Sequence, residues 1–378
     1  MVRNIARAIG SFGDLARPLE LVAQSQGRLW RAGKVIASVF EIDQALIPPA
    51  EILLQPGDTL LMIDSSWEQY ADFAPLFQAT RQLGGSIVTV VYDLIPLQYP
   101  QFCTPGLVVA FERWFRLAVQ HSDMLLCISA AVASEVRGSL ASAGADGEPG
   151  SGPSIRSWPL GADLLVSRRE RTVRPAVAAI GRHNEDPRQR QGQRQEQEGA
   201  GEGASPLFLV VGTIEPRKGH DFVLDAFDLL WARGIDVRLC IAGSVGWQTE
   251  RTVGRIRQHP QLGKQLFFVE QFTDAEINLC YHAATALIAA SVAEGFGLPI
   301  VEAALHRVPA LAADIPVFRE VGGAGATYFS LASPQCLADA VLRFNMLGAD
   351  ERAALAAQIP TLTWEQSARR LLEAIGVS

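Results

Sequence analysis

The chain has 378 residues, of which 48% are hydrophobic and 19% charged, so it can bury the cores of two domains of ordinary size. Its formal net charge of -7 argues against a general binder of nucleic acid, because phosphate backbones are held mainly by clustered lysine and arginine. The 5 cysteines are scattered without a C-x-x-C pair, and no apolar run approaches the ~20 residues that span a bilayer. These features predict a soluble or at most peripheral protein of a reducing cytoplasm, without a structural metal.

The first half of the chain alternates short apolar, β-rich runs with helical patterns, which is typical of a parallel sheet. The expected strands are Asp58–Asp64, Ser86–Tyr92, Asp123–Ile128 and the shorter Ser154–Gly161. The aromatic and basic segment Phe111–Leu117 predicts a core-facing helix, and contact with a membrane surface is the alternative. The polar stretch 187–203 buries too little apolar surface to offset the entropy of ordering it. We therefore predict an N-terminal domain over residues 1–175 and a polar, disordered linker over residues 176–205.

The same alternation of short apolar runs with helical patterns resumes after the linker and predicts a second parallel sheet over residues 206–361. The expected strands are Leu207–Thr213, Val237–Gly243, Leu266–Val269, Ala286–Ala290 and Ala310–Ala313. Residues 362–378 contain the amphipathic pattern Trp364–Ile375, which predicts a short helix. This helix can pack on either domain, including a return to the N-terminal one.

The segment V-V-G-T-I-E-P-R-K-G predicts an anion site. A buried strand ends at Gly212, and the following loop presents Arg217 beside Lys218 just before a helix. Ligands of doubly wound sheets bind at the carboxyl ends of the strands, and a paired Arg and Lys can neutralise a diphosphate there. The loop lacks the pattern G-x-x-x-x-G-K-[ST], which excludes an ATPase P-loop. On this stretch alone, two solvated loop charges are an equal alternative.

The segment A-E-G-F-G-L-P-I-V-E-A-A favours the anion site. Gly295 and Gly297 allow the backbone to approach a ligand closely, and Pro299 suits the first turn of a helix. Glu294 lies in the loop and Glu302 about one turn inside the helix, so both carboxylates can face a ligand whose phosphate binds at the helix N-terminus. Acids on both sides of an anion site fit a nucleotide sugar, which has phosphates at its centre and a polyol at each end. The alternative is that the second glutamate only caps or solvates the helix.

In these two motifs the chain resembles the retaining family-four glycosyltransferases of the GT-B fold. The segments that also carry the resemblance are Y-D-L-I-P-L from Tyr92, C-I-S from Cys127, P-L-G-A-D from Pro159, A-G-S-V-G-W from Ala242 and D-I-P-V-F-R-E-V from Asp314. These segments are similar to those of the family branch that builds bacterial surface polysaccharides, such as the O-antigen mannosyl- and rhamnosyltransferases. The resemblance implies an α/β fold with two Rossmann-like domains that face each other across a cleft.

The resemblance also implies roles for individual residues. Asp93 and Glu294 would be the catalytic contacts to the transferred sugar, Asp93 from across the cleft. Glu302 would hold the ribose hydroxyls, residues 271–273 the nucleobase, and the amides of residues 296–298 the sugar and the distal phosphate. The full set expected to bind the donor is Gly212, Arg217, Lys218, Gly243, Phe272, Thr273, Glu294, Gly295, Phe296, Gly297, Leu298 and Glu302. Within it, the adjacent Arg and Lys would hold the diphosphate.

The chain departs from the family pattern in a few places. Tyr92 occupies a position where many relatives have His, and Arg307 one where a small residue is usual. Family members begin with a strand and a Gly-rich loop, whereas residues 2–9 of this chain have the apolar spacing of a helix. We therefore expect the N-terminal domain to lack its first strand.

The activity that the resemblance implies is sugar transfer with retention from a nucleotide-sugar donor, GDP-mannose being favoured, to a growing, lipid-linked surface polysaccharide. Because retention in this family is ascribed to front-face attack, and because no D-x-D motif is visible, we expect no cofactor and no metal ion. The expected partners are the nucleotide sugar and a glycan or lipid-linked glycan acceptor, with peripheral contact at the inner face of the bacterial membrane and no nucleic acid. The alternatives are a non-catalytic nucleotide-sugar-binding protein derived from such an enzyme, or a sugar-nucleotide epimerase or hydrolase of similar fold.

Overall fold

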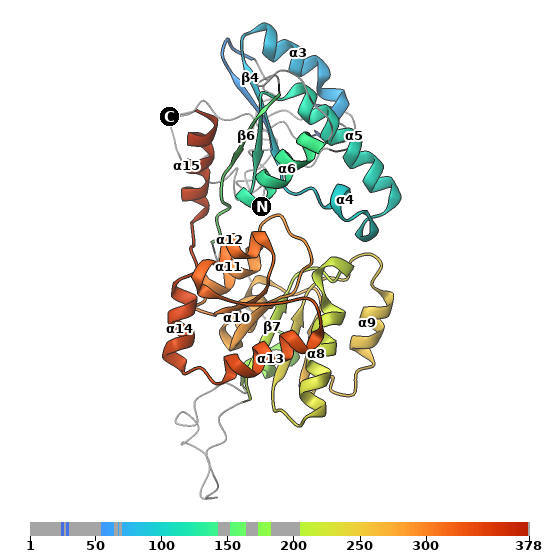
Figure 1. Cartoon of the computed structure of the whole chain (residues 1–378), viewed down its shortest axis with the longest axis vertical. Coiled ribbons are helices and arrows are strands. Elements are labelled where there is room, and N and C mark those ends of the chain that lie inside the picture. The colour runs from blue at the N-terminus through green and yellow to red at the C-terminus, as the bar shows by residue number, and fades with distance from the viewer. Residues whose placement is uncertain are drawn as a thin grey trace, which may run out of the picture. The chain divides into compact units, whose positions relative to one another are not determined.

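Two compact α/β units make up the chain, each built on a parallel sheet. The computed structural model describes residues 24–25, 28–29, 54–63, 67, 70–142, 152–163, 173–182 and 205–376. The first unit comprises Met1–Gly161, Glu294–Phe296 and Leu362–Ser378, and the second comprises Ala162–Ala293 and Gly297–Thr361. Figure 1 shows each unit as a sheet with helices packed around it. Within the described part of the chain, none of the helices has both the length and the apolar character needed to span a bilayer.

The sheet of the first unit is 4-stranded, with the order β3-β4-β5-β6, and its pairs are all parallel. Its strands are β3 (Thr59–Met62), β4 (Ser86–Val91), β5 (Met124–Cys127) and β6 (Ser154–Ser157). Each predicted strand is present but shorter than expected, because described residues at the ends, such as Asp58 and Tyr92, lie in loops; β6 stops before Trp158. The pair β1 (Gln24–Ser25) and β2 (Arg28–Leu29) is antiparallel and separate. The expected N-terminal helix and missing first strand fall on residues outside the described ranges.

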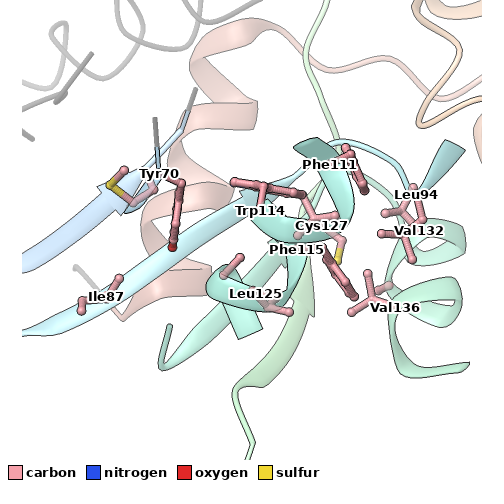
Figure 2. Close-up of a cluster of buried hydrophobic side chains, with 14 of the residues drawn as sticks. Tyr70, Ile87, Leu94, Phe111, Trp114, Phe115, Leu125, Cys127, Val132 and Val136 are labelled. Atoms are coloured by element: carbon pink, nitrogen blue, oxygen red, sulfur yellow. The ribbon is translucent and has the colours of Figure 1, made fainter. Parts of the chain in front are cut away.

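The helices of the first unit cover this sheet. They are η3 (Tyr70–Phe73), α3 (Ala74–Gln82), α4 (Ile95–Gln98), η4 (Pro100–Phe102), α5 (Pro105–His121), α6 (Ala130–Ser142) and α15 (Trp364–Ile375). Phe111, Trp114 and Phe115 of α5 are buried in the main cluster of the unit. Figure 2 shows them lying between Tyr70 on one side and Val132 of α6 on the other. The core-facing interpretation of residues 111–117 is confirmed for these aromatic side chains.

The C-terminal helix α15 packs on the segment that follows β6. Trp158 Nε1 donates to Ser367 Oγ (3.2 Å), and the same hydroxyl donates to Pro159 O (2.8 Å). A Cβ placed at Gly161 would lie 2.5 Å from Thr363 O, so only glycine allows this approach. The helix therefore belongs to the first unit, although it follows the whole of the second unit in the chain.

The second unit has a 6-stranded parallel sheet with the order β12-β11-β10-β7-β8-β9. Its strands are β7 (Leu207–Val211), β8 (Arg238–Ala242), β9 (Leu266–Val269), β10 (Ala286–Ala289), β11 (Ala310–Ala313) and β12 (Ala326–Phe329). Its helices are α7 (Pro175–Arg182), η6 (Pro216–Lys218), α8 (His220–Ala232), α9 (Glu250–Arg257), α10 (Asp274–Ala283), α11 (Leu298–Leu305), α12 (Pro316–Gly322), η7 (Gly323–Gly325), α13 (Pro334–Asn345) and α14 (Ala349–Ala357). Strand β12, which pairs with β11, was not predicted, because its sequence ATYF lacks the continuous apolar run of the other strands.

The strand order reverses between β7 and β10, and this reversal positions the site. The chain runs outward from β7 through β8 to β9 and then returns to β10, on the other side of β7. Because crossovers between parallel strands are right-handed, α8 and α9 are expected on one face of the sheet and α10, α11 and α12 on the other. Outside this crossover pattern, α13 packs on α8 and α7 packs on α10. The loops after β7 and β10 thus meet at the carboxyl edge of the sheet, where doubly wound folds bind ligands.

The linker differs from the prediction at its start. Residues 175–182 form α7, which packs on α10, and the second unit begins at Ala162. The helix forms because its apolar face covers α10 and because Arg174 forms an ion pair with Glu276 (2.7 Å). Residues 183–204 of the expected linker lie outside the described ranges.

Candidate functional site

The loop after β7 brings Gly212 and Lys218 together. Gly212 has a φ of +142°, a conformation that L side chains rarely adopt. A Cβ placed there would lie 3.9 Å from Lys218 Cε and 4.0 Å from Lys218 Nζ. The lysine side chain therefore folds back over the end of β7, where the glycine leaves the backbone uncovered.

Gly243, at the end of β8, packs directly against this loop. Gly212 N donates to Ala242 O (3.0 Å), and a Cβ placed at Gly243 would lie 1.8 Å from Gly212 O. Beyond the strands, Ile214 N donates to Ser244 O (2.8 Å), so the two loops continue the pairing of β7 and β8. Close backbone packing by itself accounts for the glycine at 243.

Arg217 links the loop after β7 to the loop after β10. Its Nη1 donates to Ala293 O (3.0 Å), and its Nη2 forms an ion pair with Glu215 Oε1 (3.0 Å). Val292 N donates to Arg217 O (2.8 Å), which ties the backbones as well. The side chains of Arg217 and Glu215 are only 18% and 5% exposed. The guanidinium is therefore fixed at the strand reversal before any ligand arrives, and Glu215 is a partner that the sequence analysis missed.

The start of α8 is closely packed. Gly219 has a φ of +72°, and a Cβ there would lie 2.3 Å from Ala290 O, so this position requires glycine. The next residue, His220, is buried, and its burial lowers its pKa to about 4. The imidazole at the first position of the helix is therefore neutral at neutral pH.

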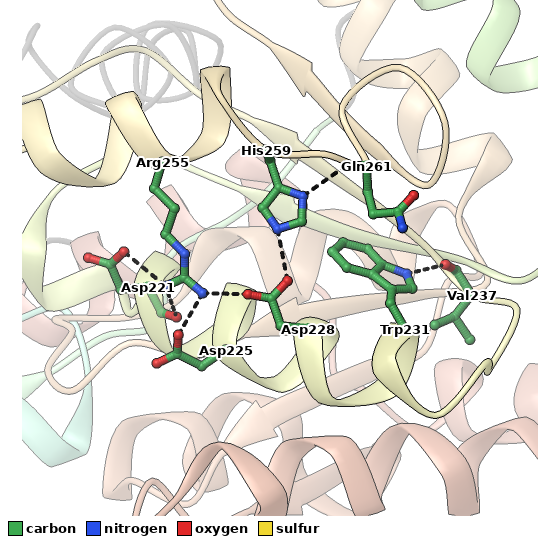
Figure 3. A network of polar contacts seen from close by, with 8 residues as sticks. All are labelled: Asp221, Asp225, Asp228, Trp231, Val237, Arg255, His259 and Gln261. Carbon is green, nitrogen blue, oxygen red and sulfur yellow. Dashed lines mark hydrogen bonds and ion pairs between the residues drawn. The ribbon is translucent and has the colours of Figure 1, made fainter.

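A network of charges holds α8 against α9 (Figure 3). Arg255 forms ion pairs with Asp225 (2.6 Å), Asp228 (2.8 Å) and Asp221 (3.4 Å). His259 Nε2 lies 2.8 Å from Asp228 Oδ1. Because Asp221 is near the first residue of α8, this network fixes the helix that carries the Arg and Lys loop at its N-terminus.

Helix α11 presents Glu302. It begins after Gly297, whose φ is +101° and whose Cβ would lie 2.9 Å from Phe318 Cε1. Pro299 occupies the first turn, as expected. Glu302 Oε2 accepts a hydrogen bond from Tyr281 OH (2.8 Å), and burial raises the pKa of Glu302. The carboxylate neither caps nor merely solvates the helix, because a buried tyrosine holds it.

The segment expected to contact the nucleobase starts α10. Thr273 Oγ1 accepts from Glu276 N (3.2 Å), and Glu276 Oε2 accepts from Thr273 N (3.1 Å), which makes a capping box. Glu276 also accepts from Arg174 Nε (2.7 Å), and this guanidinium is the main cause that lowers the pKa of Glu276 to about 2. The Thr273 side chain therefore serves the helix start, and half-buried Phe272 precedes it.

Asp93 follows β4 in the first unit. Its Oδ1 accepts from Ile95 N (3.0 Å), which begins α4, and the neighbouring Tyr92 OH donates to Ile63 O. Burial and the nearby Asp93 raise the pKa of Glu135 on α6. Glu135 is thus an acidic neighbour that the sequence analysis missed, because α6 showed no motif.

The remaining predicted residues divide between the units. Glu294, Gly295 and Phe296 are part of the first unit, whereas Leu298 is the first residue of α11 in the second. Their roles stay predictions. Across the described ranges, no group of three or more His, Cys, Asp or Glu side chains is arranged to hold a metal ion.

Comparison with known sequences connects these features to a family. Residues 193–359 match the family described as "Glycosyl transferases group 1". The chain is 34% identical over 322 residues to the serotype-specific mannosyltransferase WbdA of Escherichia coli, which covers 85% of this chain and 37% of WbdA. It is 28% identical over 149 residues to the O-antigen chain mannosyltransferase RfbU of Salmonella typhimurium, covering 36% of this chain and 41% of RfbU. The matched segments therefore cover less than half the length of each of these relatives.

Comparison with solved structures concerns the fold alone, because the identities are low. HepE of Anabaena, solved with UDP and glucose, has a TM-score of 0.59 at 15% identity and covers 84% of this chain and 78% of its own. Sucrose-phosphate synthase of Thermosynechococcus elongatus has a TM-score of 0.59 at 17% identity, with coverage of 99% and 91%. The predicted GT-B fold, with two parallel-sheet units, is confirmed. Residues 193–359 therefore resemble the group 1 glycosyl transferases, and the chain has a GT-B fold.

Proposed function

We propose that the chain transfers mannose with retention from GDP-mannose to a growing, lipid-linked surface polysaccharide. The relatives support the sugar and the product, since WbdA and RfbU are mannosyltransferases and RfbU is named for the O-antigen chain. Anabaena HepE, which has the same fold, was solved with a nucleoside diphosphate and a sugar. The HepE complex favours a nucleotide-sugar donor.

The observation that carries the proposal is the fixed position of Arg217 where the strand order reverses. Its guanidinium is held between Glu215 and Ala293 O, and Lys218 folds over Gly212 in the same loop. Two cations at the carboxyl edge of a parallel sheet suit a diphosphate, and a pre-positioned guanidinium loses little freedom when it binds one.

The proposed chemistry needs no nucleophile from the protein. The acceptor hydroxyl oxygen forms a bond to C1 of the sugar on the face from which the diphosphate leaves. The bond from C1 to the phosphate oxygen breaks, its electron pair stays on that oxygen, and the oxygen takes the proton of the acceptor. Arg217, Lys218 and the N-terminus of α11 would balance the charge of the leaving group, while Asp93 and Glu294 would contact the sugar.

The test follows the purified chain with GDP-mannose, with and without a mannose-terminated lipid-linked acceptor, by NMR of the anomeric protons. We expect an α-linked product from the α-linked donor, only when acceptor is present, and an unchanged rate in the presence of a chelator. A β-linked product would overturn retention, and a rate restored only by magnesium or manganese would overturn metal independence. Free mannose released without acceptor would indicate a hydrolase, and binding without turnover a non-catalytic protein.

The donor base is tested separately. Thermal-shift measurements with GDP, UDP, dTDP and ADP compare how much each ligand stabilises the folded chain. We expect the largest shift with GDP. A larger shift with another nucleotide would replace the base in the proposal without affecting the diphosphate site.

A further inference from the structure

Tyr281 of α10 and Glu302 of α11 form a buried pair. The Tyr281 ring is 1% exposed, and its hydroxyl donates to Glu302 Oε2 at 2.8 Å. The two residues come from different helices of the second unit, so their contact depends on how α10 and α11 pack. A phenol hydroxyl in an apolar interior requires a hydrogen-bond acceptor, and the carboxylate supplies it.

The tyrosine ring is fixed from its other side. It stacks on His306, with ring centroids 4.9 Å apart and an interplanar angle of 16°, and His306 in turn meets His282 edge-on at 4.7 Å. Burial lowers the pKa of His306 to about 4, so its imidazole is neutral at neutral pH. The Tyr281 ring therefore packs against an uncharged imidazole. Because the stack holds the ring in place, the Tyr281 hydroxyl points in one direction, toward Glu302.

We propose that Tyr281 is a positioning residue that holds Glu302 Oε2 and thereby presents Oε1 to the ribose hydroxyls of the donor nucleotide. This inference rests on the proposed function, in which Glu302 binds the ribose. A carboxylate that already accepts a hydrogen bond on one oxygen keeps a single orientation, so it binds hydroxyl donors at a lower entropic cost. Tyr281 thus sets the preference of the site for a ribonucleotide over one without ribose hydroxyls.

The surroundings of the pair define its response to pH. Burial raises the pKa of Glu302, and the hydrogen bond from Tyr281 opposes that rise. The other titratable or charged groups on α10, on α11 and its C-terminal end, on the packed helices α12 and α14, and just before the packed helix α7 are Asp274, Glu276, Cys280, His282, His306, Arg307, Arg319, Glu320, Asp350, Glu351, Arg352 and Arg174. None of these is a cause of the Glu302 shift. Loss of the hydroxyl should therefore raise the pKa of Glu302 further.

The test is Tyr281→Phe, which keeps the ring and its stack and removes only the hydroxyl. Calorimetry compares GDP with 2′,3′-dideoxy-GDP across a pH series on the full chain. We expect GDP affinity to fall roughly 10-fold, as for other residues that orient a binding group, while dideoxy-GDP affinity stays nearly constant. The acid limb of GDP binding should also move to higher pH, which a merely structural role would not cause.

Two further variants make the outcome decisive. Tyr328→Phe is the matched control, because the Tyr328 hydroxyl donates to Gly323 O (2.8 Å) and does not contact Glu302. Unchanged affinity for dideoxy-GDP shows that Tyr281→Phe is folded, so the effect on ribose binding is measured in the same variant. If Glu302→Gln loses the preference for GDP while Tyr281→Phe keeps both the preference and the pH profile, the inference is wrong and the proposed function stands. If Glu302→Gln also keeps the preference, the ribose contact of the proposed function fails.

Discussion

Two cations follow one another in the loop after β7, and their side chains are held differently. Arg217 is 18% exposed and is bound by Glu215 and Ala293 O, so it also joins two loops of the second unit. Lys218 folds over Gly212 and remains partly exposed. The first side chain therefore contributes to both stability and the proposed binding, and the second mainly to binding.

Substitution by alanine should separate these contributions. For Lys218→Ala we expect a loss of about 1.5 to 3 kcal/mol in GDP binding, almost none in guanosine binding, and little change in melting temperature. Arg217→Ala should show the same selective loss and in addition lower the free energy of unfolding by about 2 kcal/mol, because Glu215 and Ala293 O lose a donor. Calorimetry and urea denaturation measure the two quantities.

The control for the lysine is Lys264→Ala, since Lys264 is exposed and far along the chain in a turn before β9. It should bind GDP as the unmodified chain does. Equal losses for guanosine and GDP in Lys218→Ala would show that this lysine does not bind the diphosphate.

At the scale of elements, one ion pair joins α7 to α10. Arg174, just before α7, donates to both carboxylate oxygens of Glu276, which also completes the capping box of α10 with Thr273. The Glu276 side chain is 1% exposed and that of Arg174 is 50% exposed. The pair is therefore worth more than a surface ion pair, because one of its charges is desolvated.

Removal of this guanidinium should loosen α7. We expect Arg174→Ala to lower the free energy of unfolding by about 2 kcal/mol, since a buried carboxylate loses its charged hydrogen bonds. Arg233→Ala is the control, because its bond to Gln335 is exposed, and it should cost less than about 1 kcal/mol. Urea denaturation measures the free energy of unfolding of both variants. Equal losses would contradict the conclusion that the Arg174–Glu276 pair is worth more than a surface contact.

At the scale of the whole molecule, the burial of histidines makes the free energy of unfolding depend on pH. Burial lowers the pKa of His220 to about 4, against 6.5 for an exposed histidine. Between these values the unfolded chain binds the proton and the folded chain does not, so stability is complete above pH 6.5 and falls as the pH drops toward 4. Burial raises the pKa of Glu302, whose protonation in acid partly opposes this loss.

The expected result is a loss of about 3 kcal/mol of unfolding free energy from His220 alone between pH 6.5 and 4. His220→Phe cannot titrate, so the difference between this variant and the unmodified chain isolates the histidine. Urea denaturation across that pH range should give a flatter profile for His220→Phe. Parallel profiles would mean that the imidazole is protonated in the folded state.

Much of the local structure follows from the sequence alone. The predicted ranges for β9, β11 and α15 coincide with the observed ones, because each is a short apolar run or an amphipathic helix with clear ends. Thr363 and Gln366 form a capping box that fixes the start of α15. Strand β12 did not stand out, because its sequence ATYF contains polar Thr327 and Tyr328, whereas the equally short β9 and β11 are continuous apolar runs.

The partners of the site residues were decided by the tertiary structure. Nothing in the local pattern joins Arg217 to Ala293 or Tyr281 to Glu302, because these contacts connect loops and helices that follow different strands. They form because the chain reverses direction across the sheet after β9 and returns beside β7, which places the loops after β7 and β10 together. The motifs determined which residue types stand at the site, whereas strand order and helix packing decided which atoms they hold, because hydrogen bonds require contact in space rather than spacing along the chain.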